Sequence, residues 1–92
     1  MTDRLPASLR LKAITPRALL VDADVDEVQL PSIDGLIGIF PGHRPLVTAL
    51  GYGRLTYRQG TESESYAVRG GYAEIEPDKM LVFTELDEDG SE

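Results

Sequence analysis

The most informative segment of the chain is Gly35-Leu36-Ile37-Gly38-Ile39-Phe40-Pro41-Gly42-His43-Arg44-Pro45-Leu46. It joins a hydrophobic strand to a turn and contains the only histidine of the sequence. Residues 40–43 predict a type II turn, because proline favours the φ of the second position and glycine accepts the positive φ of the third. The segment is therefore expected to be a structured loop and not a linker.

On both sides of this loop, short segments alternate apolar and polar residues, as in residues 9–13 and 54–58. This period is typical of half-buried strands, and the turn residues between the segments favour an all-β sandwich or flattened barrel. Pro77-Asp78 is expected to join residues 72–76 and 79–83 in a hairpin. Residues 45–50 are compatible with either a strand or a helical turn, and Gly51-Tyr52-Gly53 ends them.

Two positions break the alternation. Val21, Ala23 and Val25 occupy odd positions, whereas the next apolar residues occupy even ones, so one extra residue near Asp26-Glu27 predicts a β-bulge. Gly70-Gly71 lies inside a strand-like stretch and indicates a second bulge or a close approach of two backbones.

Length and composition limit the possible function. The 92 residues form one domain with a single modest core, and without cysteine no disulfide or thiolate metal site is available. No run reaches the roughly 18–20 apolar residues of a membrane span, and no signal-peptide core follows Met1, so a chain that is neither inserted nor exported is expected.

The formal charge of −7 is concentrated at the C-terminus. Residues 1–84 hold eleven acidic and nine basic side chains, so their net charge is only −2. The bases are dispersed, which disfavours nucleic-acid binding. Residues 85–92 are expected to be an acidic, disordered tail, residues 1–7 an N-terminal extension, and residues 8–84 the β-sandwich domain.

No residue pattern indicates catalysis, a cofactor or a metal. Asp22, Asp24 and Asp26 resemble the start of a calcium loop, but the glycine and the glutamate that such a loop needs are absent, and an acidic edge strand is the preferred interpretation. His43 lacks a nucleophile to activate and partners for zinc. The glycines match no phosphate-binding loop. The residues alone thus predict a small, non-enzymatic adaptor domain.

The chain also resembles the epsilon subunit of rotary ATP synthases, called delta in mitochondria. The resemblance covers roughly residues 8–84 and has its specific core in Gly38-Ile39-Phe40-Pro41-Gly42-His43 with the downstream Gly70-Gly71. It further includes residues 25–30, Gly35, 45–46, 48–50, Gly53 and 68–75.

The resemblance implies an approximately ten-stranded sandwich in the central stalk, which links the gamma subunit to the c-subunit ring and couples proton or sodium flow to ATP synthesis without catalysing a reaction. The implied location is the cytoplasmic face of the bacterial inner membrane, or its organellar counterpart. The implied c-ring contact loop comprises Leu36, Gly38, Phe40, Pro41, Gly42, His43 and Arg44, and the structural glycines are Gly35, Gly53, Gly70 and Gly71.

Two departures and one alternative accompany this resemblance. Many family members carry an acidic or polar residue where this chain has Leu36, and a small residue where it has Arg44. The family's helical hairpin, which inhibits ATP hydrolysis and senses nucleotide, is expected to be lacking, through natural shortness or truncation. The alternative is an unrelated β-sandwich that binds a peptide or carbohydrate, although the sequence contains no tryptophan for a sugar platform.

Overall fold

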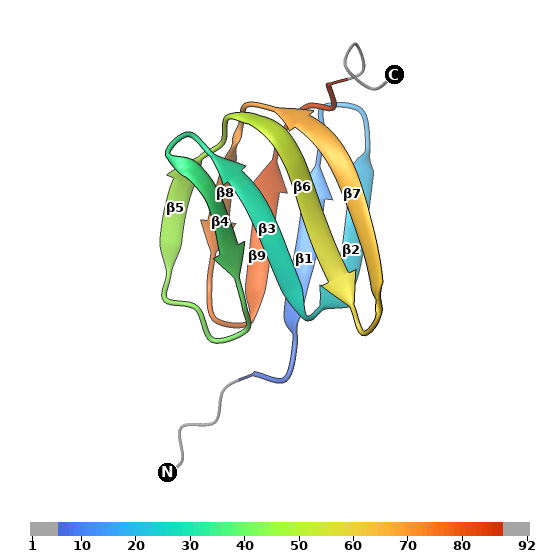
Figure 1. Cartoon of the computed structure of the whole chain (residues 1–92), viewed down its shortest axis with the longest axis vertical. Coiled ribbons are helices and arrows are strands. Elements are labelled where there is room, and N and C mark those ends of the chain that lie inside the picture. The colour runs from blue at the N-terminus through green and yellow to red at the C-terminus, as the bar shows by residue number, and fades with distance from the viewer. Residues whose placement is uncertain (1–5, 88–92) are drawn as a thin grey trace.

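A computed structural model describes residues 6–87 as nine strands in two packed sheets, without a helix in that range (Figure 1). The predicted all-β sandwich is confirmed, with nine strands against the expected ten or so. The strands are β1 (Leu9–Ile14), β2 (Leu19–Val25), β3 (Glu27–Ser32), β4 (Gly35–Ile39), β5 (Leu46–Ala49), β6 (Tyr52–Gln59), β7 (Glu62–Arg69), β8 (Tyr72–Ile75) and β9 (Lys79–Phe83).

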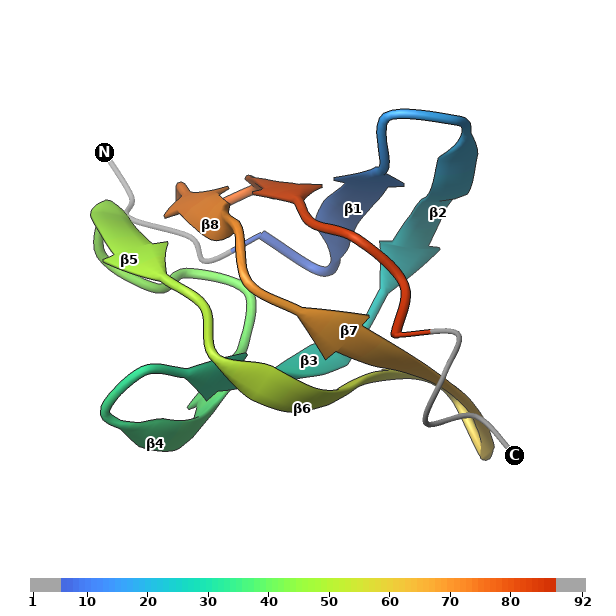
Figure 2. The same cartoon turned by 90° about the horizontal axis from the view of Figure 1, so that it is seen from above.

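The two sheets form the two layers seen from above in Figure 2. One sheet has five strands in the order β2-β1-β9-β8-β5, and the other has four in the order β4-β3-β6-β7. Every pairing is antiparallel except that of β1 with β9. Strands β2, β5, β4 and β7 are therefore the edge strands of the described domain.

Alternate residues of each strand point into the space between the sheets and form one core. The predicted inward set of β1, Leu9, Leu11 and Ala13, is fully buried, as are Leu30 and Leu55 of the facing sheet. Other buried members are Val21, Val25, Val28, Ile39, Leu50, Val68, Ala73, Ile75, Met80 and Val82. Because a strand buries only every second side chain, the outer faces of both sheets remain available for partners.

The expected bulge near Asp26 is wrong in form. β2 ends at Val25 in the five-stranded sheet and β3 begins at Glu27 in the four-stranded sheet, so Asp26 is the corner at which the chain changes layer. The extra residue exists, but it reverses which parity faces inward because the core lies on opposite sides of the two strands. The sequence pattern of a corner and that of a bulge are the same.

Gly71 confirms the close backbone approach that was one of the two interpretations of the double glycine. It has φ of +102°, and a Cβ there would overlap the carbonyl oxygen of Phe83. Gly70 has φ of +71° with open space around its α-carbon. Together they carry the chain from β7 in one sheet to β8 in the other.

Two further sequence predictions have a clear outcome. The hairpin of β8 and β9 is present and closes with a hydrogen bond of 2.8 Å from the N–H of Glu76 to the carbonyl of Lys79. The ambiguous residues after Pro45 form strand β5.

The end of the described chain runs along β7. The N–H of Arg69 donates to Glu85, Leu86 bridges Val68, and the N–H of Asp87 donates to Ala67. Residues 85–87 of the range expected as a tail thus lie against the sandwich, and residues 88–92 lie outside the described residues.

Candidate functional site

The turn after β4 has the geometry predicted from its sequence. Gly42 has φ of +92°, and the N–H of His43 donates to the carbonyl of Phe40 at 3.2 Å. The N–H of Gly42 donates to the carbonyl of Pro77 at 2.7 Å, which fixes the turn against the β8–β9 hairpin. The turn is therefore a rigid projection at the end of the sandwich.

Of the predicted loop residues, Leu36 and Gly38 lie on the outer face of edge strand β4, and Phe40 directly follows the strand. Leu36 and Phe40 are largely exposed, and the absence of a side chain at Gly38 leaves room for the Phe40 ring, whose Cε1 lies 3.8 Å from the position of a Cβ there. The carboxylate of Glu27 approaches the same position. These residues form a mainly apolar stripe along β4.

His43 and Arg44 lie at the other end of β4 from Leu36. Leu36 and Phe40 are four residues apart, which corresponds to about 13 Å along a strand, and the turn leads farther away. The Nδ1 of His43 donates to the carbonyl of Arg44 at 2.6 Å, so only Nε2 is left for a partner. The predicted contact loop is thus not one compact cluster.

A row of apolar side chains, whose members the sequence analysis did not identify, crosses the outer face of the five-stranded sheet. Its members are cross-strand neighbours from edge to edge: Leu19, Ile14, Phe83, Tyr72 and Ala49. The rings of Tyr72 and Phe83 stack with centroids 5.0 Å apart. We call these five residues the apolar row. The sequence signal that could have identified this row is the presence of apolar residues at strand positions whose parity points toward solvent.

The neighbouring rows of the outer surface contain charged or polar side chains, with single apolar ones among them. The adjacent row of the five-stranded sheet consists of the cross-strand neighbours Asp22, Lys12, Leu81, Glu74 and Val47. On the four-stranded sheet the central cross-strand neighbours are Gln29, Thr56 and Ser65. Unlike the adjacent row, the apolar row contains no charged side chain.

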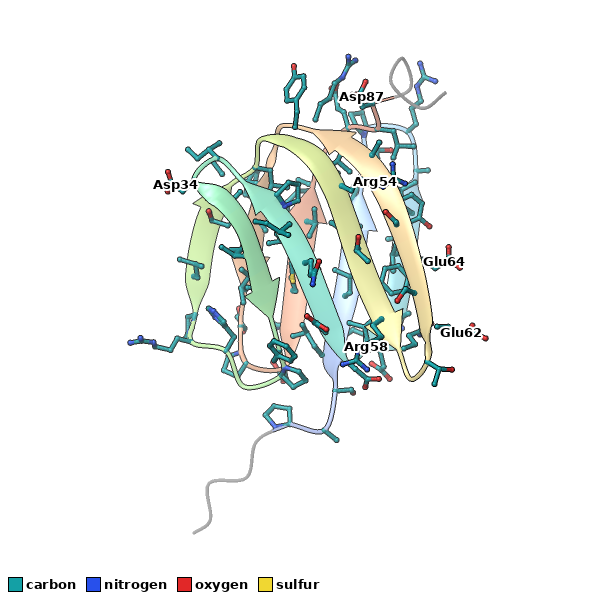
Figure 3. The ribbon with its side chains drawn as sticks, in the orientation of Figure 1. Asp34, Arg54, Arg58, Glu62, Glu64 and Asp87 are labelled. Atoms are coloured by element: carbon teal, nitrogen blue, oxygen red, sulfur yellow. The ribbon has the colours of Figure 1, made fainter. Side chains whose placement is uncertain are left out.

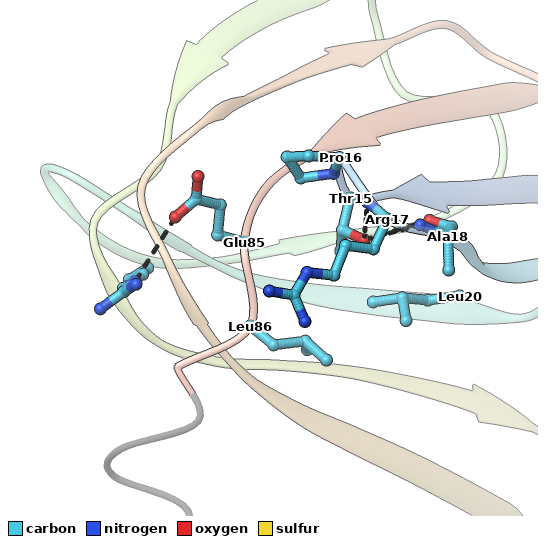
Figure 4. A pocket seen from close by; sticks show the side chains of 8 residues that line it. Thr15, Pro16, Arg17, Ala18, Leu20, Glu85 and Leu86 are labelled. Atoms are coloured by element: carbon cyan, nitrogen blue, oxygen red, sulfur yellow. Dashed lines mark hydrogen bonds and ion pairs between the residues drawn. The ribbon is translucent and has the colours of Figure 1, made fainter.

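A groove of about 390 Å³ opens between the β1–β2 connection and the segment after β9 (Figure 4). Thr15, Arg17 and Leu20 line one side, and Leu86 and Glu85 line the other. Glu85 pairs with Arg69 at 3.5 Å.

Each of the three aspartates singled out in the sequence forms an ion pair with an arginine. Arg10 of β1 lies 2.9 Å from Asp22 and 3.3 Å from Asp24, which are both on edge strand β2. The hydrogen bonds to Asp24 and Asp22 raise the pKa of Arg10. Asp26 pairs with Arg58 at 3.6 Å. Among residues 6–87, no three histidine, aspartate or glutamate side chains are grouped closely enough to hold a metal ion.

Comparison with known proteins gives the family. The model of the ATP synthase delta/epsilon chain β-sandwich domain matches residues 8–88. The chain belongs to this family. The unrelated peptide- or carbohydrate-binding module left open by the sequence is not supported.

Relatives within the family are ATP synthase epsilon chains. That of Prochlorococcus marinus strain MIT 9515 is 42% identical over 85 residues, or 92% of this chain and 63% of the relative. That of Solibacter usitatus strain Ellin6076 is 39% identical over 88 residues, or 96% of this chain and 66% of the relative. The chain thus spans less than two thirds of either relative.

Solved structures with the same fold include two from mitochondrial ATP synthases. A chain of the Euglena gracilis enzyme matches with a TM-score of 0.83 and 21% identity, over 89% of this chain and 53% of that one. A chain of the Tetrahymena thermophila central stalk and c ring matches with a TM-score of 0.70 and 14% identity, over 84% and 63%. At these identities the likeness describes the epsilon-type fold.

Proposed function

We propose that the chain is the β-sandwich of a non-catalytic central-stalk subunit, which links the gamma subunit to the c ring and supports coupling of ion flow to ATP synthesis. Its place is then peripheral, on the cytoplasmic face of the bacterial membrane or its organellar counterpart. No helix within residues 6–87 is both long and apolar enough to cross a bilayer. The observation that supports this proposal most directly is the apolar row on a domain of this family.

The apolar row is the proposed contact for the gamma subunit. It spans the full width of the five-stranded sheet, and the Tyr72–Phe83 stack gives it a stiff aromatic centre. Aromatic side chains on a rigid sheet lose little entropy on docking and are enriched at the centres of interfaces. An interface of standard size, about 1,200–2,000 Å² in total, is expected.

The c ring is the second proposed partner, and the loop from Leu36 to Arg44 is its proposed contact. The β4 stripe and the turn belong to the four-stranded sheet and its end, whereas the apolar row belongs to the other layer. A domain with separate surfaces for two partners suits a connecting role in a rotating stalk.

Gel filtration with the cognate gamma subunit tests the first contact. The wild-type chain should co-elute with gamma, and the double variant Leu19→Glu, Tyr72→Glu should not, because each carboxylate would be buried in the interface. Gln29→Glu on the polar outer face of the other sheet is the matched control and should co-elute. Loss of binding in the control, or retention in the double variant, would place the gamma contact elsewhere.

A further inference from the structure

Strand β7 is the edge of the four-stranded sheet that lies farthest from β4, because the strand order is β4-β3-β6-β7. The surfaces proposed for gamma and for the c ring lie on the other sheet and around β4, so neither covers this edge. The segment after β9 pairs only with the end of β7: Asp87 donates its N–H to the Ala67 carbonyl, and Arg69 donates its N–H to the Glu85 carbonyl, both at 2.9 Å. Among the described residues, positions 62–66 of β7 have no strand partner on this side.

The backbone of β7 offers hydrogen bonds along this stretch. In an antiparallel strand, successive residues direct their N–H and C=O groups to opposite edges. The contacts of Ala67 and Arg69 with the segment after β9 show that the odd-numbered residues of β7 face away from β6. Ser63 and Ser65 therefore direct their N–H and C=O groups outward, where they make no backbone hydrogen bond with the part of the chain that the structure describes. We call residues 62–66 the free edge.

The side chains of the free edge differ between the two faces of the sheet. Ser63 and Ser65 are small and lie on the outer face, whereas Glu62, Glu64 and Tyr66 lie on the opposite face, where Tyr66 packs against the core. Both glutamates are exposed, and neither forms an ion pair or a hydrogen bond with the described residues. Figure 3 shows them at the outer edge of the domain. The free edge thus presents two carboxylates that are about 7 Å apart along the strand and carry their full charge.

The other acidic edge strand, β2, differs in this respect. Its two carboxylates, Asp22 and Asp24, share Arg10 at 2.9 Å and 3.3 Å. The single base of β7, Arg69, lies at the far end of the strand and pairs with Glu85 at 3.5 Å. Unlike β2, the free edge has no cation within the described residues to neutralise it.

The charge of the free edge selects against two occupants. A second copy paired through β7 would bring the glutamates of the two copies together, which is destabilising. The sequence that follows residue 87, Glu88-Asp89-Gly90-Ser91-Glu92, contains three further acidic residues and would meet like charge there as well. An extended segment with basic side chains has the complementary charge.

We propose that the free edge is a docking site for an extended segment of a partner protein that carries lysine or arginine at alternate positions. The segment adds one strand to the four-stranded sheet and runs antiparallel to β7, as Leu86 does beside Val68. Ser63 and Ser65 exchange backbone hydrogen bonds with the residues between the basic ones, and the basic side chains lie opposite Glu64 and its neighbours. This contact goes beyond the proposed function, since it uses neither the apolar row nor the loop after β4.

Titration of the isotope-labelled chain with a synthetic peptide tests the chemistry. The probe is a capped octapeptide of alternating lysine and valine. In nuclear magnetic resonance spectra the amide signals of Ser63 and Ser65 should shift, and their hydrogen exchange should slow, as the peptide binds. The Kd should rise by about tenfold or more between about 20 mM and about 500 mM salt. A peptide of alternating glutamate and valine, and one with all its lysines in a single block, are the controls and should bind at least about tenfold more weakly.

Two double variants that remove the same charge test the location. Glu62→Gln combined with Glu64→Gln should weaken binding of the lysine–valine peptide by about tenfold at low salt. Glu74→Gln combined with Asp78→Asn alters two exposed carboxylates on the other sheet and in its hairpin turn, and this control should bind as the wild type does. Unchanged urea midpoints would exclude unfolding, since all four side chains are exposed.

Methylated peptides test the backbone pairing without any change in the protein. In the proposed antiparallel register the valine N–H groups face β7 and the lysine N–H groups face away. Methylation of the valine amide nitrogens should therefore abolish binding, and methylation of the lysine amide nitrogens should leave it within about threefold of the unmodified peptide.

Each contrary result overturns the inference. Equal binding by the two double variants, or of the two methylated peptides, would show charge attraction without strand addition. Shifts of the Ser63 and Ser65 amides that depend on protein concentration in the absence of peptide would show that a second copy occupies the free edge. Failure of the lysine–valine peptide to bind at about 1 mM would show that the free edge does not accept a strand. All of these results leave the proposed function unaffected.

Discussion

The Asp26 carboxylate accepts a hydrogen bond of 2.7 Å from the backbone N–H of Gly60, 34 residues later in the chain. Arg58 completes this link, because it lies 3.6 Å from the same carboxylate and donates to the Gly60 carbonyl at 3.2 Å. The corner that changes layer is thereby tied to the β6–β7 turn, near the position of Arg58 in Figure 3. Hydrogen bonds and an ion pair therefore hold the chain in place where it crosses between the two sheets.

Replacing Asp26 with alanine should weaken the link between this corner and the β6–β7 turn. The variant loses the hydrogen bond to Gly60 and one of the two acidic partners of Arg58, which keeps Glu27 at 3.4 Å. Because the side chains of Asp26 and Arg58 are partly exposed, the free energy of unfolding should fall by only about 1 kcal/mol. Urea denaturation followed by circular dichroism measures the change. Asp78→Ala is the control, since its carboxylate has no side-chain partner within residues 6–87, and it should unfold as the wild type does. Equal stability of the two variants would mean that the Gly60 contact contributes nothing.

The double glycine offers a matched pair of substitutions. Gly71→Ala should destabilise the domain by about 3 kcal/mol or more, because the new methyl group would overlap the Phe83 carbonyl at a φ that alanine rarely adopts. Gly70→Ala meets open space and adds only the left-handed strain of about 1–2 kcal/mol. Thermal unfolding of the two variants side by side measures the difference. A Gly70→Ala variant as unstable as Gly71→Ala would show that backbone strain, and not the close approach, dominates.

These positions also show how far the sequence predicts the structure. Gly42 and Pro41 define a turn through local geometry alone, so their conformation follows from residue type. The conformation at Asp26 does not follow from residue type, because one inserted residue produces the same change of parity in a bulge and in a corner. Only the sheet to which the next strand belongs distinguishes the two structures. β5 was ambiguous for a related reason, since its pairing with β8 decides between strand and turn.

The surfaces proposed for binding were less predictable than the fold. The apolar row depends on the order β2-β1-β9-β8-β5, in which β1 lies beside β9 although they are far apart in sequence. Ile14 and Phe83 each look like ordinary strand residues until that parallel pairing makes them neighbours.

The turn at Gly42 should tolerate change poorly without being essential for folding. Gly42→Val forces a β-branched residue to a φ of +92° and should cost about 1–3 kcal/mol. Pro41→Ala, which can keep the same backbone angles, should cost less than about 1 kcal/mol. Chemical denaturation measures both, and ATP-driven pumping in reconstituted vesicles reports whether the turn contributes to coupling. If the Gly42→Val variant is folded and pumps at the wild-type rate, the turn has only a structural role.

Alkaline pH should destabilise the domain partly through Tyr57. Burial raises the pKa of Tyr57 above its ordinary value, with smaller contributions from Tyr66 and Glu64. The folded state therefore holds this proton more tightly than the unfolded state does, and the resulting stability is present below the unfolded pKa of about 10 and is lost as pH rises above it. The free energy of unfolding, measured between pH 8 and 11, should fall less steeply for Tyr57→Phe than for the wild type. Tyr52→Phe, at a highly exposed tyrosine, is the control and should keep the wild-type slope; the same slope in Tyr57→Phe would show that the alkaline loss of stability arises from other groups.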